Sequence, residues 1–400
     1  MNDNIIKIKI DTLGFGGDGI GRNEGLVCFI PGTLPGEEIL AKVTKQKKKY
    51  LICSLVEILK TSPIRIQPVC PLAYSPNNNG NKYCPGCIYQ NVEYKNEVEF
   101  KNRQLTELFK KFSGVTENII KVPVQADNEL YYRNKIVLHS GNKNSLFGYY
   151  SNDNRTILNT NHCYLAHKKI NEALSCIQRE KNYIINNRTT FRYTKNNGVT
   201  IFNNDYNKDK LLTETTEHGI FKVPLSSFFQ VNPAQHDKII GELLKIFDNI
   251  EFKHLIDIYC GVGIFGIIAA KYTGKTVYAT EIDEKAIETA KINAEIHNVK
   301  NIKFIAGDAK ATSGQILNRV DNNNTAVILD PPRTGLSKDF TQILCKNKPK
   351  YIIYISCSAD TLCRDINMLK NVDYNVEHSR LIDMFPRTAH FETISLLSLK

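Results

Sequence analysis

The chain has 400 residues, of which 42% are hydrophobic and 23% are charged, and its formal net charge is +11. A chain of this length exceeds one ordinary hydrophobic core, so we expect two or three domains. It has no apolar run of the roughly 20 residues that a membrane helix needs, and its first residues lack a signal-peptide pattern, so we expect a soluble cytoplasmic protein.

The positive net charge is typical of proteins whose partner is a polyanion such as nucleic acid. A generally basic proteome would produce the same excess, so charge alone leaves RNA or DNA binding open. The sequence contains no tryptophan. Any stacking on nucleic acid bases must therefore use tyrosine, phenylalanine, histidine or arginine.

Residues 1–60 form the first predicted domain. The stretch IKIKIDTLGFGGDGIGR alternates apolar and polar residues and then turns at glycines. Short strands with regular turn signals predict a small β-barrel. The domain also contains KVTKQKKKY, in which five lysines precede Tyr50. This run is either a solvated loop or the phosphate-contacting edge of an RNA-binding barrel.

Residues 61–225 are less regular and form the predicted central α+β domain. They combine a helical stretch rich in lysine and glutamate, VEYKNEVEFKNRQLTELFKKF, with several polar strand-like segments. The tract SPNNNGNK at 75–82 is a polar insertion, which we expect to form a mobile loop.

Four of the eleven cysteines form a candidate metal set. Cysteines of a cytoplasmic chain are rarely disulfide-bonded, which leaves metal ligation, catalysis and ordinary burial. The sequence CPGC gives Cys84 and Cys87 the spacing of a metal half-site, and Cys70 and Cys163 lie on either side of it. A zinc site with four thiolates is one interpretation.

The pattern changes in residues 226–400, the third predicted domain. Apolar strand-like runs (HLIDIYCG, TVYATEID, IKFIAGDA, AVILDPP and YIIYISC) alternate with helical stretches. This alternation predicts a parallel sheet that is covered on both faces. Polar side chains gather at the carboxyl ends of the strands, where ligands of open α/β sheets bind. They are Asp257, Tyr259, Cys260, Glu281, Asp308, Asp330 and Cys357.

The first strand end carries a glycine motif. Gly261, Gly263 and Gly266 have the spacing G-x-G-x-x-G, and Glu281 follows twenty residues after Gly261. Glycines allow the backbone to approach a ligand, and a carboxylate at this distance can hold both hydroxyls of a ribose. The pattern predicts an adenosine-containing cofactor, either NAD or S-adenosylmethionine. A tight turn without a ligand is the alternative.

Later motifs add candidate chemistry. Asp330 opens DPPR, in which two prolines would hold the carboxylate at the sheet edge as a rigid wall for a base ring, unless the motif is only a structural turn. Cys357 ends its strand beside the predicted cofactor site and is a catalytic candidate, whereas Cys363 fits core packing. His390 and Glu392 are two residues apart, so on a strand they share a face and could transfer protons.

These motifs together resemble those of the RNA uridine-C5 methyltransferases, which make 5-methyluridine. The likeness begins in GFGGDGIGR…GLVCFIPGTLPGE, which looks like a TRAM domain, and continues through SFFQVN, DIYCGVG, TEID, DPPRTG, YISC…TLCRD and DMFPRTAHFE. It implies an OB-like TRAM barrel, a central RNA-binding domain and a Rossmann-like, S-adenosylmethionine-dependent methyltransferase domain. The chain departs from the family at Ser358 and Ala359, where Asn-Pro is frequent, and at Ile264, where some members have Asn.

The resemblance also implies roles for individual residues. Cys357 would be the nucleophile and Glu392 the general base. The contacts to S-adenosylmethionine would come from Gln230, Tyr259, Glu281 and Asp330, with Asp308 added from its position at a strand end. The family likeness favours a [4Fe–4S] cluster over zinc on the metal set, Cys70, Cys84, Cys87 and Cys163.

The expected partner is RNA. A TRAM-like domain combined with cluster cysteines favours 23S rRNA, and the T-loop uridine of tRNA is the alternative. We expect a monomer, because large RNA substrates leave no need for an oligomer. Two interpretations from other classes stay open: an NAD-dependent oxidoreductase, and an RNA-binding protein whose enzyme fold is inactive.

Overall fold

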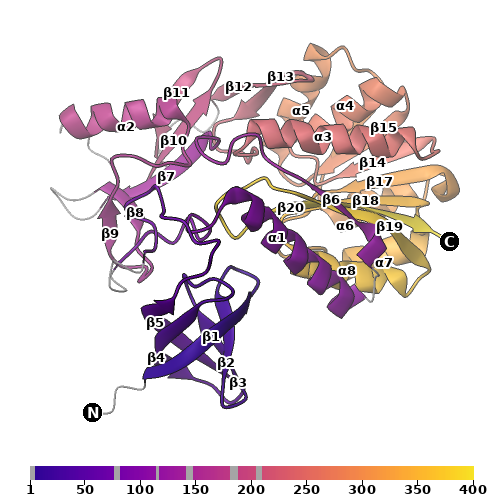
Figure 1. Cartoon of the computed structure of the whole chain (residues 1–400). Helices are drawn as coiled ribbons and strands as arrows, with labels where there is room; N and C mark the ends of the chain where they lie inside the picture. Colours follow the sequence, from indigo (N-terminus) through magenta and orange to yellow (C-terminus); the bar gives the residue numbers. More distant parts are fainter. Residues whose placement is uncertain (1–4, 76–81, 114–116, 141–146, 181–187, 204–209) are drawn as a thin grey trace.

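The structure is a computed structural model that describes residues 5–75, 82–113, 117–140, 147–180, 188–203 and 210–400 (Figure 1). The polar tract predicted at 75–82 lies almost wholly outside these residues. A barrel, a central sheet and a larger α/β part are arranged around one another (Figure 1). No helix in the described part of the chain is long and apolar enough to cross a membrane.

The N-terminal part is a closed barrel of five strands, in the order β1-β2-β3-β5-β4. Alternate side chains of a strand face the same way, so Ile8 and Ile10 both enter the barrel core, where they meet Cys28 and Ile39. The predicted small barrel is therefore confirmed. Its strands are β1 (Ile5–Leu13), β2 (Gly19–Asn23), β3 (Leu26–Ile30), β4 (Glu38–Gln46) and β5 (Tyr50–Lys60).

The central part combines one helix with two antiparallel sheets. A five-stranded sheet has the order β11-β10-β7-β8-β9, and β12 pairs with β13 in a hairpin. The helix α2 (Lys168–Glu180) covers the five-stranded sheet and buries Ile170 and Leu174. The strands are β7 (Lys135–Ser140), β8 (Phe147–Tyr150), β9 (Ile157–Asn159), β10 (Arg188–Thr194), β11 (Gly198–Phe202), β12 (Leu211–Thr216) and β13 (Gly219–Pro224).

One segment from the range predicted as central packs on the C-terminal part instead. The strand β6 (Ile120–Val124) pairs in parallel with β19 and forms an edge of the large sheet. It follows the helical segments α1 (Tyr94–Leu108), η2 (Phe109–Ser113) and η3 (Glu117–Ile119). The side chains of Leu105 and Phe109 enter the core beneath α8. The sequence IKVPV of β6 has no buried alternation that would have predicted this pairing.

The C-terminal part is an eight-stranded sheet in the order β16-β15-β14-β17-β18-β20-β19-β6. The strands from β14 to β18 are parallel, as predicted, and β20 pairs antiparallel with both β18 and β19. The strands are β14 (His254–Ile258), β15 (Thr276–Glu281), β16 (Ile302–Ala306), β17 (Thr325–Leu329), β18 (Tyr351–Ser356), β19 (Tyr374–Ile382) and β20 (Glu392–Leu399).

Helices cover both faces of this sheet, with α3, α4 and α5 on one face and α6, α7 and α8 on the other (Figure 1). Apolar side chains of both helix layers pack on strands that are buried along their whole length, such as β17. The helical segments are α3 (Pro233–Asp248), α4 (Ile264–Thr273), α5 (Glu284–Ile296), α6 (Ala309–Leu317), η4 (Asn322–Asn324), α7 (Lys338–Asn347) and α8 (Ala359–Lys370).

Buried charges join α1 to the segment that precedes β20. Lys101 Nζ lies 2.7 Å from Glu97 Oε1 and 2.8 Å from Asp383 Oδ1, and none of the three side chains is exposed. The backbone N–H of Arg387 donates to Glu97 Oε1 at 2.7 Å. Burial alone would lower the pKa of Lys101, but the two carboxylates outweigh it and raise that pKa. We call Lys101, Glu97, Asp383 and Arg387 the Lys101 cluster.

We predict that Lys101→Met lowers the free energy of unfolding by about 3–5 kcal/mol, because it leaves two buried carboxylates without their shared cation. The matched control is Lys169→Met, since Lys169 makes an exposed pair with Glu172 at 2.8 Å. Solvent screens such a pair, so we expect no measurable loss. Urea denaturation followed by far-UV circular dichroism measures both variants. Equal losses would contradict a special role for the Lys101 cluster.

Candidate active site

The pairing of β18 with β20 brings the two predicted catalytic residues together. The antiparallel register joins Ser356 at the end of β18 to Thr393 near the start of β20. Extending this register by one residue on each strand would pair Cys357 with Glu392, and Glu392 is among the charges that raise the pKa of the Cys357 thiol. Directly opposite residues of an antiparallel pair have Cβ atoms roughly 5 Å apart and face the same side. The Cys357 side chain is partly exposed, whereas Glu392 is buried.

Burial and neighbouring acidic charges raise the pKa of both acids of this pair. Burial, followed by the charge of Glu392, raises the pKa of the Cys357 thiol to about 11, whereas Arg333 opposes the rise. Burial, followed by the charge of Asp330, raises the pKa of Glu392 well above its usual range, and Arg333 again opposes the rise. Raising the pH therefore favours the Cys357 thiolate. These shifts bring all four residues into one electrostatic site.

Asp330 stands at the end of β17, where the sequence predicted a rigid wall. Burial raises the pKa of its carboxyl to about 7. The loop that follows is held by α8, because Arg364 Nη2 donates to Thr334 O at 3.0 Å and Leu336 N donates to Asp365 Oδ2 at 2.8 Å. The structure thus holds the loop through hydrogen bonds to α8 as well as through the two prolines.

His390 does not fit the shared strand face that the sequence predicted. The strand β20 begins at Glu392, so His390 precedes it, and the His390 side chain is exposed. Its ring centroid lies 6.4 Å from that of Phe385 in an edge-on contact. Cys363 is fully buried in the core between α8 and the sheet, so the prediction of a packing role is confirmed.

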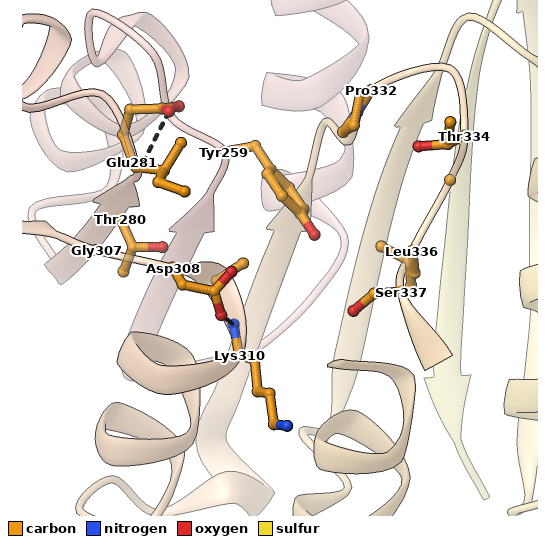
Figure 2. A pocket seen from close by; sticks show the side chains of 13 residues that line it. Tyr259, Thr280, Glu281, Gly307, Asp308, Lys310, Pro332, Thr334, Leu336 and Ser337 are labelled. Atoms are coloured by element: carbon orange, nitrogen blue, oxygen red, sulfur yellow. Dashed lines mark hydrogen bonds between the residues drawn. The ribbon is translucent and has the colours of Figure 1, made fainter. Parts of the chain in front are cut away.

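A cavity of about 300 Å³ opens at the carboxyl ends of the strands, and neither residue of the predicted catalytic pair is among its lining residues (Figure 2). The ends of β15 and β16 form one side of it, and the loop after β17 forms the other (Figure 2). Three predicted cofactor residues line it: Tyr259, Glu281 and Asp308. Gln230 and Asp330 are not among the lining residues.

The glycine turn and Glu281 are bound to each other. Glu281 Oε2 accepts a hydrogen bond from Gly261 N at 3.1 Å, and Oε1 accepts one from Ile282 N at 2.8 Å. Beneath the turn, the buried Asp257 accepts from Gly266 N at 2.8 Å. A Cβ atom on Gly266 would lie only 2.8 Å from Asp257 Oδ2, so this position requires glycine. The motif therefore packs the start of α4 tightly against β14.

The other predicted cofactor residues differ in what they contact. Asp308 caps α6 by accepting from Lys310 N at 2.9 Å. Gln230 is buried, and its Oε1 has no hydrogen-bond partner among the described residues. Thr280, which sequence reasoning missed, lines the cavity, and its buried Oγ1 likewise lacks a partner in the described part of the chain. Its position one residue before Glu281 was the signal that could have identified it.

The four cysteines of the metal set approach one another without forming an assembled site. Cys84 N donates to Leu72 O at 2.7 Å, which joins its loop to the turn after Cys70. Burial, followed by the charges of Cys163 and Cys84, raises the pKa of Cys87, so these thiols lie near one another. All four are free thiols. Within the described ranges, however, no three or more His, Cys, Asp or Glu side chains form a group that could hold a metal ion.

Sequence comparisons relate the chain to RNA methyltransferases. The profile of the tRNA (uracil-5-)-methyltransferase family matches residues 191–400, and that of the TRAM domain matches residues 2–56. A relative from Clostridium acetobutylicum, named as an uncharacterized RNA methyltransferase, is 27% identical and covers 99% of this chain and 97% of its own length. Another with the same description, from Listeria innocua, is 29% identical and covers 99% and 98%.

A solved structure agrees with these matches. The crystal structure of Pyrococcus abyssi tRNA (uracil-54, C5)-methyltransferase in complex with S-adenosyl-L-homocysteine covers 98% of this chain and 100% of that chain, with a TM-score of 0.75 and 25% identity. The predicted S-adenosylmethionine-dependent methyltransferase fold with an N-terminal TRAM domain is thereby confirmed. The chain belongs to the tRNA (uracil-5-)-methyltransferase family.

Proposed function

We propose that this protein methylates C5 of a uridine in RNA, with S-adenosylmethionine as the methyl donor. The observation that carries the proposal is the pairing of Ser356 with Thr393, which brings their chain neighbours Cys357 and Glu392 close enough for Glu392 to affect the pKa of the thiol. A thiol and a carboxyl at the carboxyl edge of the sheet, the edge at which the cavity also opens, provide a nucleophile and a proton acceptor together.

The chemistry follows from the low reactivity of uracil C5. In the proposed reaction, the Cys357 thiolate adds to C6, which makes C5 an enolate-like nucleophile. C5 would then form a bond to the methyl group that bound S-adenosylmethionine supplies, and S-adenosylhomocysteine would be the leaving group. Glu392 then removes the proton from C5, and the electron pair reforms the C5–C6 double bond while the C6–sulfur bond breaks. The target uridine must leave its base stack to reach the site.

Arg333 is the residue that makes this cycle workable. Both Cys357 and Glu392 must lose a proton at some stage, and burial opposes the ionisation of each. The Arg333 charge lowers the pKa of both groups, so it favours first the thiolate and later the carboxylate. We assign Arg333 the stabilisation of whichever of the two groups is ionised.

Five residues are the proposed contacts to S-adenosylmethionine. Three of them line the cavity, and the carboxylate of Glu281 lies against the glycine turn, where it can reach a ribose. Gln230 has an unpartnered buried oxygen that suits a donor on the ligand. Asp330 lies beside the catalytic pair, as its effect on the pKa of Cys357 indicates. The five are Gln230, Tyr259, Glu281, Asp308 and Asp330.

We propose 23S rRNA as the substrate and the T-loop uridine of tRNA as the second candidate. The TRAM barrel supports binding to RNA, and its exposed lysines between β4 and β5 suit phosphate contacts. The second candidate is favoured by the Pyrococcus abyssi neighbour, which acts on uracil-54 of tRNA according to its name.

We also propose that Cys70, Cys84, Cys87 and Cys163 hold a [4Fe–4S] cluster. Four free thiols from two segments of the central part are the donor set that such a cluster uses. Since these thiols are not arranged as a metal site in the described residues, loading would have to draw them together. A cluster at this place would be structural, because it lies outside the catalytic pair and the cavity.

We predict that deleting the gene removes 5-methyluridine from one or two positions of 23S rRNA. A plasmid copy of the protein should restore the modification, and a copy with Cys357→Ala should not. Sequencing-based mapping of 5-methyluridine in total RNA measures the outcome. Loss of the modification from the T loop of tRNA, with rRNA unchanged, would replace the first candidate substrate with the second.

We predict that Cys357→Ala abolishes methylation of a transcript while its RNA affinity stays unchanged. Glu392→Gln should instead accumulate a covalent protein–RNA adduct, because the C5 proton can no longer be removed. Denaturing gels detect the adduct, and transfer of a labelled methyl group measures activity. The control is Cys345→Ala, since this half-buried cysteine on α7 lies outside the site. Full turnover by the Cys357 variant would exclude the proposed nucleophile.

We predict about four iron and four sulfide per chain in protein purified without oxygen, together with absorbance near roughly 400 nm. Cys84→Ser or Cys87→Ser should lose most of this iron. Cys176→Ser is the control, because that cysteine is exposed on α2 and outside the set. Stoichiometric zinc without iron would refute the cluster.

A further inference from the structure

A second cavity, of about 350 Å³, lies between the central sheet and the start of α3. It shares no lining residue with the first cavity. Its walls come from the loop before β7, the end of β10, β12 and the first turn of α3. The residues used below are Tyr131, Asn134, His167, Tyr193, Lys195 and Gln235. Neither the catalytic pair nor the proposed cofactor contacts use this cavity.

Two buried polar groups on its wall lack partners. Asn134 is 4% exposed and Gln235 is 1% exposed. Asn134 Nδ2, a donor, and Gln235 Oε1, an acceptor, have no hydrogen-bond partner among the described residues. Leaving such groups unsatisfied is costly, so their presence points to a ligand that completes them. A donor and an acceptor that line one cavity, and that both lack partners among the described residues, form a pattern that the edge of a nucleobase can match.

Aromatic rings supply the stacking surface that a base requires. The rings of His167 and Tyr193 stack with centroids 4.0 Å apart and an interplanar angle of 13°. Tyr131 stands nearby in the left-handed region, at φ 59°, where its N–H donates to Tyr164 O at 2.8 Å. Lys168 Nζ lies 5.7 Å from the centre of the Tyr131 ring. Stacking of this kind accepts any base, because every base has a π face.

The charges around the cavity also suit a nucleotide. Its two acidic residues are both paired, Glu214 with Arg192 at 2.8 Å and Asp127 with Lys238 at 2.7 Å. Lys195 is exposed at the rim, where it can meet a phosphate. The wall therefore presents no unpaired negative charge, among the described residues, that would repel an RNA backbone.

The cavity is tied to the active site through the first turn of α3. Gln235 Nε2 donates to Asp383 O at 2.9 Å, and Asn232 Nδ2 donates to Met384 O at 3.1 Å. Both acceptors belong to the segment that leads to Glu392 in β20. Gln230 precedes Gln235 by five residues, so their Cα atoms are at most about 18 Å apart. A base bound here would belong to the RNA close to the target uridine.

We propose that this second cavity binds one unstacked nucleobase of the RNA substrate, a few nucleotides from the target uridine. Asn134 and Gln235 bind the edge of this base, and the stacked pair of His167 and Tyr193 presents one outer ring face to it. The cavity then fixes the register of the RNA, so that a particular uridine reaches Cys357. This inference rests on the proposed function, from which its test is separable.

A double-mutant cycle between protein and RNA tests the inference. The probe is a stem-loop transcript around the mapped uridine, in which single flanking nucleotides are replaced one at a time by abasic residues. Asn134→Ala and His167→Leu should each weaken binding of the intact transcript roughly tenfold. For one abasic position, both variants should bind as tightly as the unaltered protein does. Tyr272→Leu, an exposed tyrosine on α4, is the control and should change nothing.

The possible outcomes distinguish the inference from the proposed function. If the losses of binding affinity from the protein variants and from the abasic replacements simply add at every position, the inference is overturned, even if the transcript is methylated normally. If the losses of binding are non-additive at one abasic position but the protein makes no 5-methyluridine, the base-binding cavity is retained and the proposed function is overturned. A second experiment measures the binding of free nucleoside monophosphates. If they bind tightly but no abasic position in the RNA gives non-additive losses, the inference is also overturned. Because Asn134 Nδ2 has no hydrogen-bond partner among the described residues, Asn134→Ala should remain folded, which far-UV circular dichroism checks.

Discussion

The arrangement of the barrel, the central part and the large sheet depends on Lys101, the cation that Glu97 and Asp383 share. Lys101 belongs to α1, whereas Asp383 begins the segment that leads to Glu392, so their ion pair fixes that segment from outside the sheet. The same helix reaches the barrel, because Gln104 Nε2 donates to Gly14 O at 2.8 Å. One helix therefore links the RNA-binding barrel to the strand that carries the proposed base. The same segment meets the first turn of α3 through the carbonyl of Asp383.

The candidate active site lies in the part of the structure that this ion pair holds, and it contains more acidic than basic side chains. Three acids, Cys357, Glu392 and Asp330, influence one another, and Arg333 is the cation whose charge opposes their mutual repulsion. Burial raises the pKa of all three acids, which suits a site that must exchange protons with a base ring. Binding RNA brings further negative charge toward these acids. In the proposed function, the exposed lysines between β4 and β5 of the barrel would supply the attraction for phosphate.

The sequence predicted those parts of the fold that depend on local pattern. Apolar runs ending in polar residues predicted the parallel strands, and strict alternation predicted the barrel. It did not predict β6, because an edge strand depends on its neighbour β19 rather than on its own alternation. The geometry of the candidate site also depends on the order of the strands in the sheet. The motif spacing named Cys357 and Glu392, but only the antiparallel return of β20 makes them neighbours. The only signal for Thr280 was its place before Glu281, and the second cavity has no sequence signature, because tertiary packing creates the polar atoms that lack partners among the described residues.

Two of the buried oxygens that lack a partner among the described residues lie at or just before the start of α3, and they lower the stability of the free protein. Gln230 and Gln235 each bury an oxygen that has no partner in the described part of the chain. Each group costs about 1–3 kcal/mol when it is left unsatisfied. The free protein is therefore destabilised by two such groups within one short stretch. Gln230 is a proposed contact to the cofactor, whereas Gln235 is a proposed contact to a base of the RNA. A ligand that supplies the missing donor recovers that free energy on binding, so cofactor and RNA would each stabilise this stretch. Because the stretch also holds the segment leading to Glu392, occupancy of either site strengthens the frame around the proposed base.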